Sequence, residues 1–242
     1  MNASIIIRRS LHVRLVVAAL AVFVAVSQAS AVTTPNLLVD PSFENPALTP
    51  FGQILGPPFL NGVWGGENAA NVVGPDNGVN PAAGARMHRM NDDGLSATQS
   101  WQKVNVAPYA ALINAGGVTV NFGALFNVPQ DILAAVGSVG VSFFNAANVP
   151  LPPPFVGVPA NPDSNPATWQ PFGISGVAVP VNTSFIRMQV AYANVTMQST
   201  LGPDRPGFVD NARLTLTYVP EPSTMGLGSI AMLGLLRLRK RR

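Results

Sequence analysis

Cysteine is absent from the chain, and its absence excludes several kinds of chemistry. Thiol catalysis, disulfide bonds and Cys-ligated zinc sites all require it. Histidine is almost as scarce, because only His12 and His88 occur in 242 residues. A serine triad needs a histidine beside a serine and a carboxylate, and the chain has no G-x-S-x-G motif. A stable fold therefore needs an adequate core, a bound metal or both.

Charged residues are also few, and their distribution matters more than their sum. They make up 10% of the chain, with a formal net charge of +3 and a pI near 9.8. Eight of the 14 basic residues lie near the two ends, which leaves six in residues 32–218. Ten of the 11 acidic residues lie in that same stretch, so its net charge is −4. We therefore expect no nucleic-acid partner, because such a partner requires a basic face.

The N-terminal segment has the three parts of a secretory signal peptide. Arg8, Arg9 and Arg14 precede an apolar run over residues 15–26, and Ala29 and Ala31 form an A-x-A cleavage site. We expect residues 1–31 to enter the secretion translocon as a signal helix and to be cut after Ala31. The flanks of the Arg8-Arg9 pair match a twin-arginine signal poorly, which favours the general secretory route.

The last 24 residues have an equally ordered build. Val219, Pro220, Glu221 and Pro222 cannot continue a strand or helix, because proline lacks an N–H and fixes φ. An apolar run over residues 225–236 follows as a transmembrane helix candidate. Five basic residues then resist crossing the bilayer; they are Arg237, Arg239, Lys240, Arg241 and Arg242. Residues 223–238 span about 24 Å as a helix, which is short against a hydrocarbon core of about 30 Å. A permanent anchor helix is the alternative.

This tail, residues 219–242, resembles the PEP-CTERM sorting signal of Gram-negative bacteria. The resemblance implies that the tail holds an exported precursor in the inner membrane. It also implies that an exosortase-type membrane protease cuts near the Pro-Glu-Pro motif. The protein would then lie at the cell surface or in the extracellular matrix.

The body, residues 32–218, shows the pattern of an all-β domain. Short β-like runs at residues 118–122, 139–144, 185–192 and 212–218 are separated by glycine, proline and asparagine. The last two runs alternate apolar and polar residues, which predicts one buried face. Residues 132–136 suggest a short helix, Asp92-Asp93-Gly94 suggests a hairpin turn, and the seven prolines of residues 149–166 predict an exposed loop.

Six segments of the body, taken in order, resemble galactose-binding-like jelly rolls, including carbohydrate-binding modules. They are residues 36–44, 84–90, 99–104, 168–172, 179–188 and 208–214. The resemblance implies a two-sheet antiparallel jelly-roll sandwich whose first and last strands are neighbours. Residues 107–135 match nothing cleanly.

The same resemblance places Glu44, after the first strand, near Asp210 in the last strand. In related jelly rolls such carboxylates meet at a structural Ca²⁺, a cation that takes oxygen ligands. We therefore expect Glu44 and Asp210 to bind calcium. The alternative is that Glu44 caps a turn while Asp210 accepts hydrogen bonds from backbone amides.

Three tryptophans and one histidine are the other candidate binding residues. Trp64 lies between glycines and is the candidate for stacking on a sugar ring, since tryptophan presents a broad face. Trp101 and Trp169 lie in predicted strands and are expected in the core. His88 is expected to be a half-exposed strand residue.

Two functions are consistent with these features. The first is a non-catalytic, exported surface or matrix protein, sorted by its tail and associated with exopolysaccharide. The second is a secreted hydrolase that acts on polysaccharide. The body offers one histidine and no recognisable nucleophile–base set, and this favours the first function.

Overall fold

The computed structural model describes residues 30–45, 49–50, 61–66, 71–92, 98–130, 132–197 and 205–220. Thr33–Tyr218 form one compact unit. Nearly all of the predicted signal peptide, and the tail from Glu221 onward, lie outside the described residues. No helix within the described ranges is long and apolar enough to cross a membrane.

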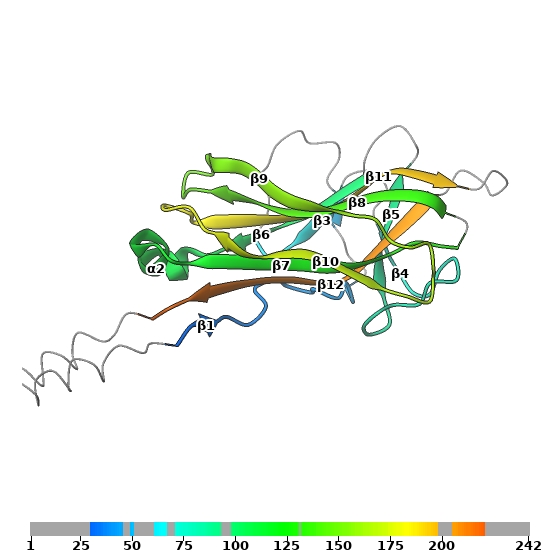
Figure 1. The fold of residues 1–242 in the computed structure, drawn as a ribbon, viewed down its shortest axis with the longest axis horizontal. Helices are drawn as coiled ribbons and strands as arrows, with labels where there is room; N and C mark the ends of the chain where they lie inside the picture. Colours follow the sequence, from blue (N-terminus) through cyan, green and yellow to red (C-terminus); the bar gives the residue numbers. More distant parts are fainter. Residues whose placement is uncertain are drawn as a thin grey trace, which may run out of the picture. The chain divides into compact units, whose positions relative to one another are not determined.

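Two six-stranded sheets form the body, and Figure 1 shows them stacked as two layers. The β7 sheet has the order β10 (Gln170–Ala178), β7 (Thr119–Asn127), β12 (Arg205–Tyr218), β5 (Met87–Asp92) and β4 (Asn71–Val73), with β1 (Val32–Thr33) also on β12. The β11 sheet has the order β2 (Thr49–Pro50), β3 (Trp64–Gly66), β6 (Thr98–Asn105), β11 (Phe185–Met197), β8 (Ile132–Phe144) and β9 (Pro150–Ala160). The pairs are antiparallel, except that β2 and β3 are parallel.

The core lies between the two sheets and follows the alternation seen in the sequence. Leu214 and Leu216 of β12 are fully buried, while Arg213 of the same strand is exposed. Alternate residues of a strand point to opposite faces, so this pattern buries one side of β12. The largest fully buried side chains include Phe43, Phe122, Phe126, Phe143, Ile186, Met188 and Tyr192. The predicted all-β sandwich of two antiparallel sheets is confirmed.

The chain's first and last strands are neighbours, as the resemblance implied. β1 pairs with β12, and the following segment continues alongside it: Thr34 N donates to Leu216 O at 2.9 Å and Leu37 N to Leu214 O at 2.8 Å. The Asn36 side chain donates to Ala212 O at 2.9 Å. The N-terminal segment of the body is therefore fastened along the last strand.

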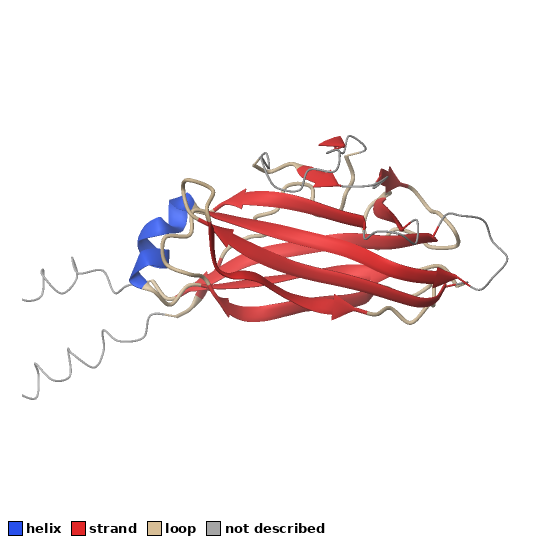
Figure 2. Cartoon of the chain, turned by 90° about the horizontal axis from the view of Figure 1, so that it is seen from above, coloured by secondary structure: helices blue, strands red, loops and turns tan. Residues whose placement is uncertain are grey.

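Two local predictions were wrong. The proline-rich stretch contains β9, which is an edge strand; exposed prolines are tolerated there because no further strand requires their missing N–H groups. Residues 132–136 begin strand β8 rather than a helix. A short helix, α2 (Ala110–Ala115), instead follows the 3₁₀ turn η1 (Ala107–Tyr109) in the stretch that matched no jelly-roll segment, and Figure 2 shows it beside the strand ends.

The predicted turn at Asp92-Asp93-Gly94 does not join a hairpin. β5 pairs with β4 and β12, whereas β6 pairs with β3 and β11, so the chain passes from one sheet to the other. Residues 93–97 themselves lie outside the described part of the chain.

Candidate functional site

Glu44 and Asp210 converge on one loop, residues 81–86. Asp210 Oδ2 accepts hydrogen bonds from Ala82 N at 2.8 Å and Ala83 N at 3.0 Å. Its Oδ1 accepts from Asn211 N at 2.6 Å. The Glu44 carboxylate accepts from Ala85 N at 3.1 Å and from Arg86 N at 3.2 Å. The two carboxylates thus hold the loop by its backbone amides, from the two ends of the body's sequence.

The Asp210 carboxyl group has a raised pKa. The residue has no exposed surface, and this burial raises its pKa to about 6. Hydrogen bonds from the N–H groups of Ala83, Asn211 and Ala82 oppose the rise, while the charge of Glu44 adds to it. The group therefore changes charge around pH 6.

The groups that contact both carboxylates are hydrogen-bond donors and not calcium ligands. They are N–H groups, whereas Ca²⁺ takes oxygen ligands. Within the described ranges, no group of three or more His, Cys, Asp or Glu residues is placed to hold a metal. The contacts match the alternative in which the two carboxylates serve backbone amides. Calcium at Glu44 and Asp210 stays a prediction.

The stability of the full chain against pH separates these alternatives. Without metal, Asp210 has a higher pKa in the folded chain than its ordinary 3.8, so its stabilising effect is complete below about pH 4. The part of the stability that comes from the raised pKa is lost as pH rises through about 6, while the hydrogen bonds from the loop amides remain. Bound calcium reverses the trend, because it requires ionised carboxylates. We would measure the melting temperature from pH 4 to 7 with EDTA and with CaCl₂. Equal melting curves in both would contradict the calcium prediction.

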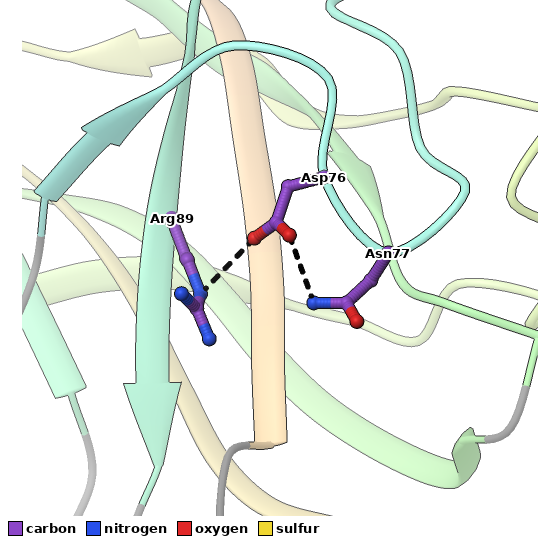
Figure 3. Close-up of polar contacts among 3 residues, drawn as sticks. All are labelled: Asp76, Asn77 and Arg89. Carbon is purple, nitrogen blue, oxygen red and sulfur yellow. Dashed lines mark hydrogen bonds and ion pairs between the residues drawn. The ribbon is translucent and has the colours of Figure 1, made fainter.

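The same loop covers a second, smaller hydrophobic cluster. Val79, Met87 and Phe208 are fully buried there, and Trp169 packs against them. An ion pair between Asp76 and Arg89, with 3.3 Å between Oδ2 and Nε, ties the turn that precedes this loop to β5 (Figure 3). Asn77 Nδ2 donates to Asp76 Oδ1 at 3.1 Å. These contacts give the loop a structural role, with the two carboxylates as its anchors.

Trp64 and His88 both belong to the core rather than to the surface. Trp64 is 4% exposed, its Nε1 donates to Asp40 O at 3.1 Å, and its ring lies 4.8 Å from that of Phe43. The His88 ring also stacks on the Phe43 ring, with 4.8 Å between the ring centroids. Trp64 is covered and does not offer a face to a sugar, and the expectation of a half-exposed His88 was wrong.

His88 and Ser100 form a polar contact inside the sandwich. His88 Nε2 and Ser100 Oγ are 2.7 Å apart, one from β5 and the other from β6, so the contact joins the two sheets. The exposed fractions are 0% and 1%. A histidine beside a serine is a catalytic arrangement only where substrate can reach it. At this depth the pair acts as a structural cross-link.

The outer side of the β7 sheet has a groove of about 380 Å³. It is lined by Gly123, Ala124, Leu125, Pro171, Phe172, Gly173, Ser175, Asn211 and Arg213. Gly123 and Gly173 are cross-strand partners, and a Cβ on Gly173 would lie 2.2 Å from Phe122 O. The Phe172 ring meets Phe126 of the core edge-on at 5.7 Å. The groove therefore offers glycine backbone and polar groups, with its aromatic ring turned inward.

The outer side of the β11 sheet is different in character. Ile186, Met188 and Val190 of β11 are fully buried, so Arg187 and Gln189 between them point outward. Their direct partners are Ser142 and Gly140 on β8, and Lys103 and Trp101 on β6. The row of Ser142, Arg187 and Lys103 is therefore polar and basic across three adjacent strands, while the row of Gln189 holds Gly140 and Trp101.

Phe155 of β9 lies on this same side, on a seat made by two glycines. Gly140 and Gly157 are cross-strand partners, and a Cβ on either would lie 2.2 Å or 2.5 Å from the Phe155 ring. Only glycine leaves room for the ring there. Phe155 is nevertheless 43% exposed. We name the group Phe155, Gly140, Ser142, Arg187, Gln189 and Lys103 the Phe155 face; Figure 2 views the sandwich from the side of the sheet that carries it.

Sequence reasoning missed Phe155 and its seat, because the prolines of residues 149–166 predict a loop where the structure has an edge strand. The usable signal was the length of the stretch, since an exposed edge strand accepts several prolines. Even so, the seat depends on the irregular register between Val141 and Phe143, which no sequence pattern specifies.

Comparisons with known proteins address the tail and the body separately. A family model described as the PEP-CTERM protein-sorting motif matches residues 219–242. No curated protein matches the chain in a sequence search. A carbohydrate-binding module solved with beta-1,4-galactotriose, TmCBM61, is similar over 75% of this chain and 98% of its own, at 16% identity and a TM-score of 0.50.

Other similar structures are also carbohydrate-binding modules. The C-terminal family 22 module of Clostridium thermocellum Xyn10B has 12% identity and a TM-score of 0.41, and covers 66% of this chain and 87% of its own. The xylan-binding CBM22-1 domain of Paenibacillus barcinonensis Xyn10C has 8% identity and a TM-score of 0.41, over 74% and 91%. The chain therefore ends in a PEP-CTERM sorting motif, and its body has the fold of carbohydrate-binding-module jelly rolls.

Proposed function

We propose that the protein is an exported, non-catalytic polysaccharide-binding protein of the cell surface or extracellular matrix, and that the Phe155 face is its binding site. The observation that carries the proposal is an exposed phenylalanine on a glycine seat, beside a row of polar side chains. The jelly-roll fold supports the proposal by analogy.

The chemistry of this face suits a sugar polymer. An aromatic ring presents a broad apolar surface to the C–H groups of a sugar ring. Next to it, Gln189 Nε2 donates to Gln99 Oε1 at 2.6 Å, which fixes two amides where hydroxyl groups would lie. Ser142 lies one row further along β8. Polar groups placed next to an apolar contact can fix the orientation of a ligand and so provide specificity.

Sorting by the tail fits this function. The predicted signal peptide brings the chain to the secretion translocon, and the PEP-CTERM motif implies processing by an exosortase-type membrane protease. The precursor is held in the inner membrane until the tail is cut. The released body then meets exopolysaccharide outside the cell.

The geometry gives less support to a secreted hydrolase that acts on polysaccharide. Hydrolysis of a glycosidic bond uses two carboxyl groups that flank the substrate. Asp210 is fully buried and serves backbone amides, and the Glu44 carboxylate does the same. The His88–Ser100 contact is inside the core.

Replacing Phe155 tests the binding site. Phe155→Ala removes the exposed ring, and we expect about tenfold weaker binding, since losing one central aromatic contact costs more than about 1 kcal/mol. The full chain in detergent would be compared by affinity electrophoresis in gels containing galactan, xylan, polygalacturonate or dextran sulfate. Phe155→Trp should retain binding.

Val181→Ala is the matched control, because Val181 is a 54% exposed apolar residue that does not belong to the Phe155 face. It should leave both binding and the melting temperature unchanged. Undiminished binding by correctly folded Phe155→Ala would show that the site lies elsewhere.

A further inference from the structure

We propose that the saccharide bound at the Phe155 face is acidic, and that its carboxylate or sulfate groups bind across Lys103 and Arg187. This inference rests on the proposed polysaccharide-binding function and names the class of polymer. Its starting point is the register of two strands: Arg187 of β11 and Lys103 of β6 are direct cross-strand partners.

Like charges directly opposite each other on neighbouring strands are unfavourable for folding. Both side chains lie on the outward side of the sheet, because Ile186, Met188 and Val104 next to them are buried in the core. An anion lying across the two strands would contact both cations and offset their repulsion. A neutral ligand has no such effect.

Lys103 is held in a largely desolvated position. It is 9% exposed, its Nζ lies 3.8 Å from the centroid of the Phe185 ring, and it donates a hydrogen bond to Asn148 Oδ1. These partners are neutral, so they orient the ammonium group without neutralising it. Burial lowers the pKa of Lys103, which is the direction expected for a cation removed from water.

Arg187 is fixed in a similar way. Its Nη2 donates to Ser142 Oγ at 3.2 Å, and its guanidinium carbon lies 5.5 Å from the centroid of the Phe144 ring. Burial lowers the pKa of Arg187 as well. The side chain remains partly exposed beside Lys103, so an anion can reach the pair from the solvent side.

The charge distribution of the body makes this pair selective. Residues 32–218 carry a net charge of −4, so the body as a whole repels acidic polymers. Two of its six basic residues nevertheless stand side by side on the sheet face that also carries the exposed Phe155. The attraction between opposite charges is stronger in a partly desolvated position than in water. An anion should therefore bind to these two cations even though the body as a whole is negatively charged.

Paired acidic and neutral polymers test the inference on the full chain in detergent. Polygalacturonate is compared with galactan, and dextran sulfate with dextran; the first pair reports on carboxylates and the second on sulfates. We expect at least tenfold tighter binding to an acidic member of one pair, weakening as salt is raised. Lys103→Gln and Arg187→Gln should each weaken acidic binding about tenfold, and should weaken it more than they weaken binding to the neutral member of the same pair.

Arg213→Gln is the control, because it makes the same change of charge on the outer side of the β7 sheet and should have no effect. Lys103→Arg keeps the charge and should retain binding. Equal affinity for acidic and neutral polymers would overturn this inference alone. Equal affinity for double-stranded DNA and for the acidic polysaccharides would also overturn it alone, because the pair would then not select an acidic saccharide. Absence of binding to every polysaccharide would overturn the proposed function with it.

Discussion

Replacing Pro220-Glu221-Pro222 with Ala-Ala-Ala is expected to abolish processing and to leave a full-length precursor in the membrane. Proline disfavours both helix and strand in this segment, and we expect an extended segment to be accessible to a membrane protease. Alanine instead favours extension of the helix predicted over the apolar run at residues 225–236, and the recognition motif is lost. The measurement is the C-terminal mass of the protein recovered from its native host.

The basic residues at the end of the chain provide the matching control. Central arginine or lysine costs about 2.5–3.5 kcal/mol on insertion scales, so five of them make passage of the tail improbable. Changing all five to serine should weaken retention in the membrane without changing the motif. A wild-type surface protein that still ends at Arg242 would contradict processing and leave the tail as an anchor.

Asp210→Ala is expected to destabilise the body by about 2–4 kcal/mol. The change leaves the amides of Ala82, Ala83 and Asn211 without their carboxylate acceptor, and each unsatisfied buried group costs about 1–3 kcal/mol. The total is reduced because the loop itself is partly exposed to water. The midpoint of urea unfolding gives the measurement.

Two variants calibrate this result. Asp210→Asn keeps one acceptor oxygen and should lose less stability than Asp210→Ala. Asp163→Ala removes a carboxylate that accepts from Asn165 N in an exposed loop, and should cost less than about 1 kcal/mol. If calcium binds at Glu44 and Asp210, Asp210→Ala should also abolish any effect of EDTA. Unfolding of Asp210→Ala at the wild-type midpoint would contradict the anchoring role.

The sequence predicted those parts of the fold whose pattern is strong and regular. β11 and β12 alternate over many residues, and both lie where the alternation indicates. Residues 132–136 are too few to separate a helix from a strand, and tertiary pairing with β11 decides the outcome. The prolines of β9 are compatible with a strand only because it lies at a sheet edge, and edge position is a property of the assembled sheet.

The candidate sites were harder to predict, for different reasons. The position of Glu44 near Asp210 follows from the order of the strands, but the identity of their partners does not, since the amides come from residues 82–86. Trp64 has glycine neighbours in the sequence and yet packs on Phe43, because three-dimensional packing decides burial. The Phe155 face combines four strands from distant parts of the chain, and no local motif encodes it.

Retention of the full chain in polysaccharide gels tests the central claim most directly. The wild-type protein would be run through native gels with and without each polymer, next to a non-binding reference protein. We predict slower migration with at least one polysaccharide, and faster migration in that gel on changing Phe155 to alanine. Unchanged migration of the wild-type protein in every gel would contradict the claim that this protein binds polysaccharide.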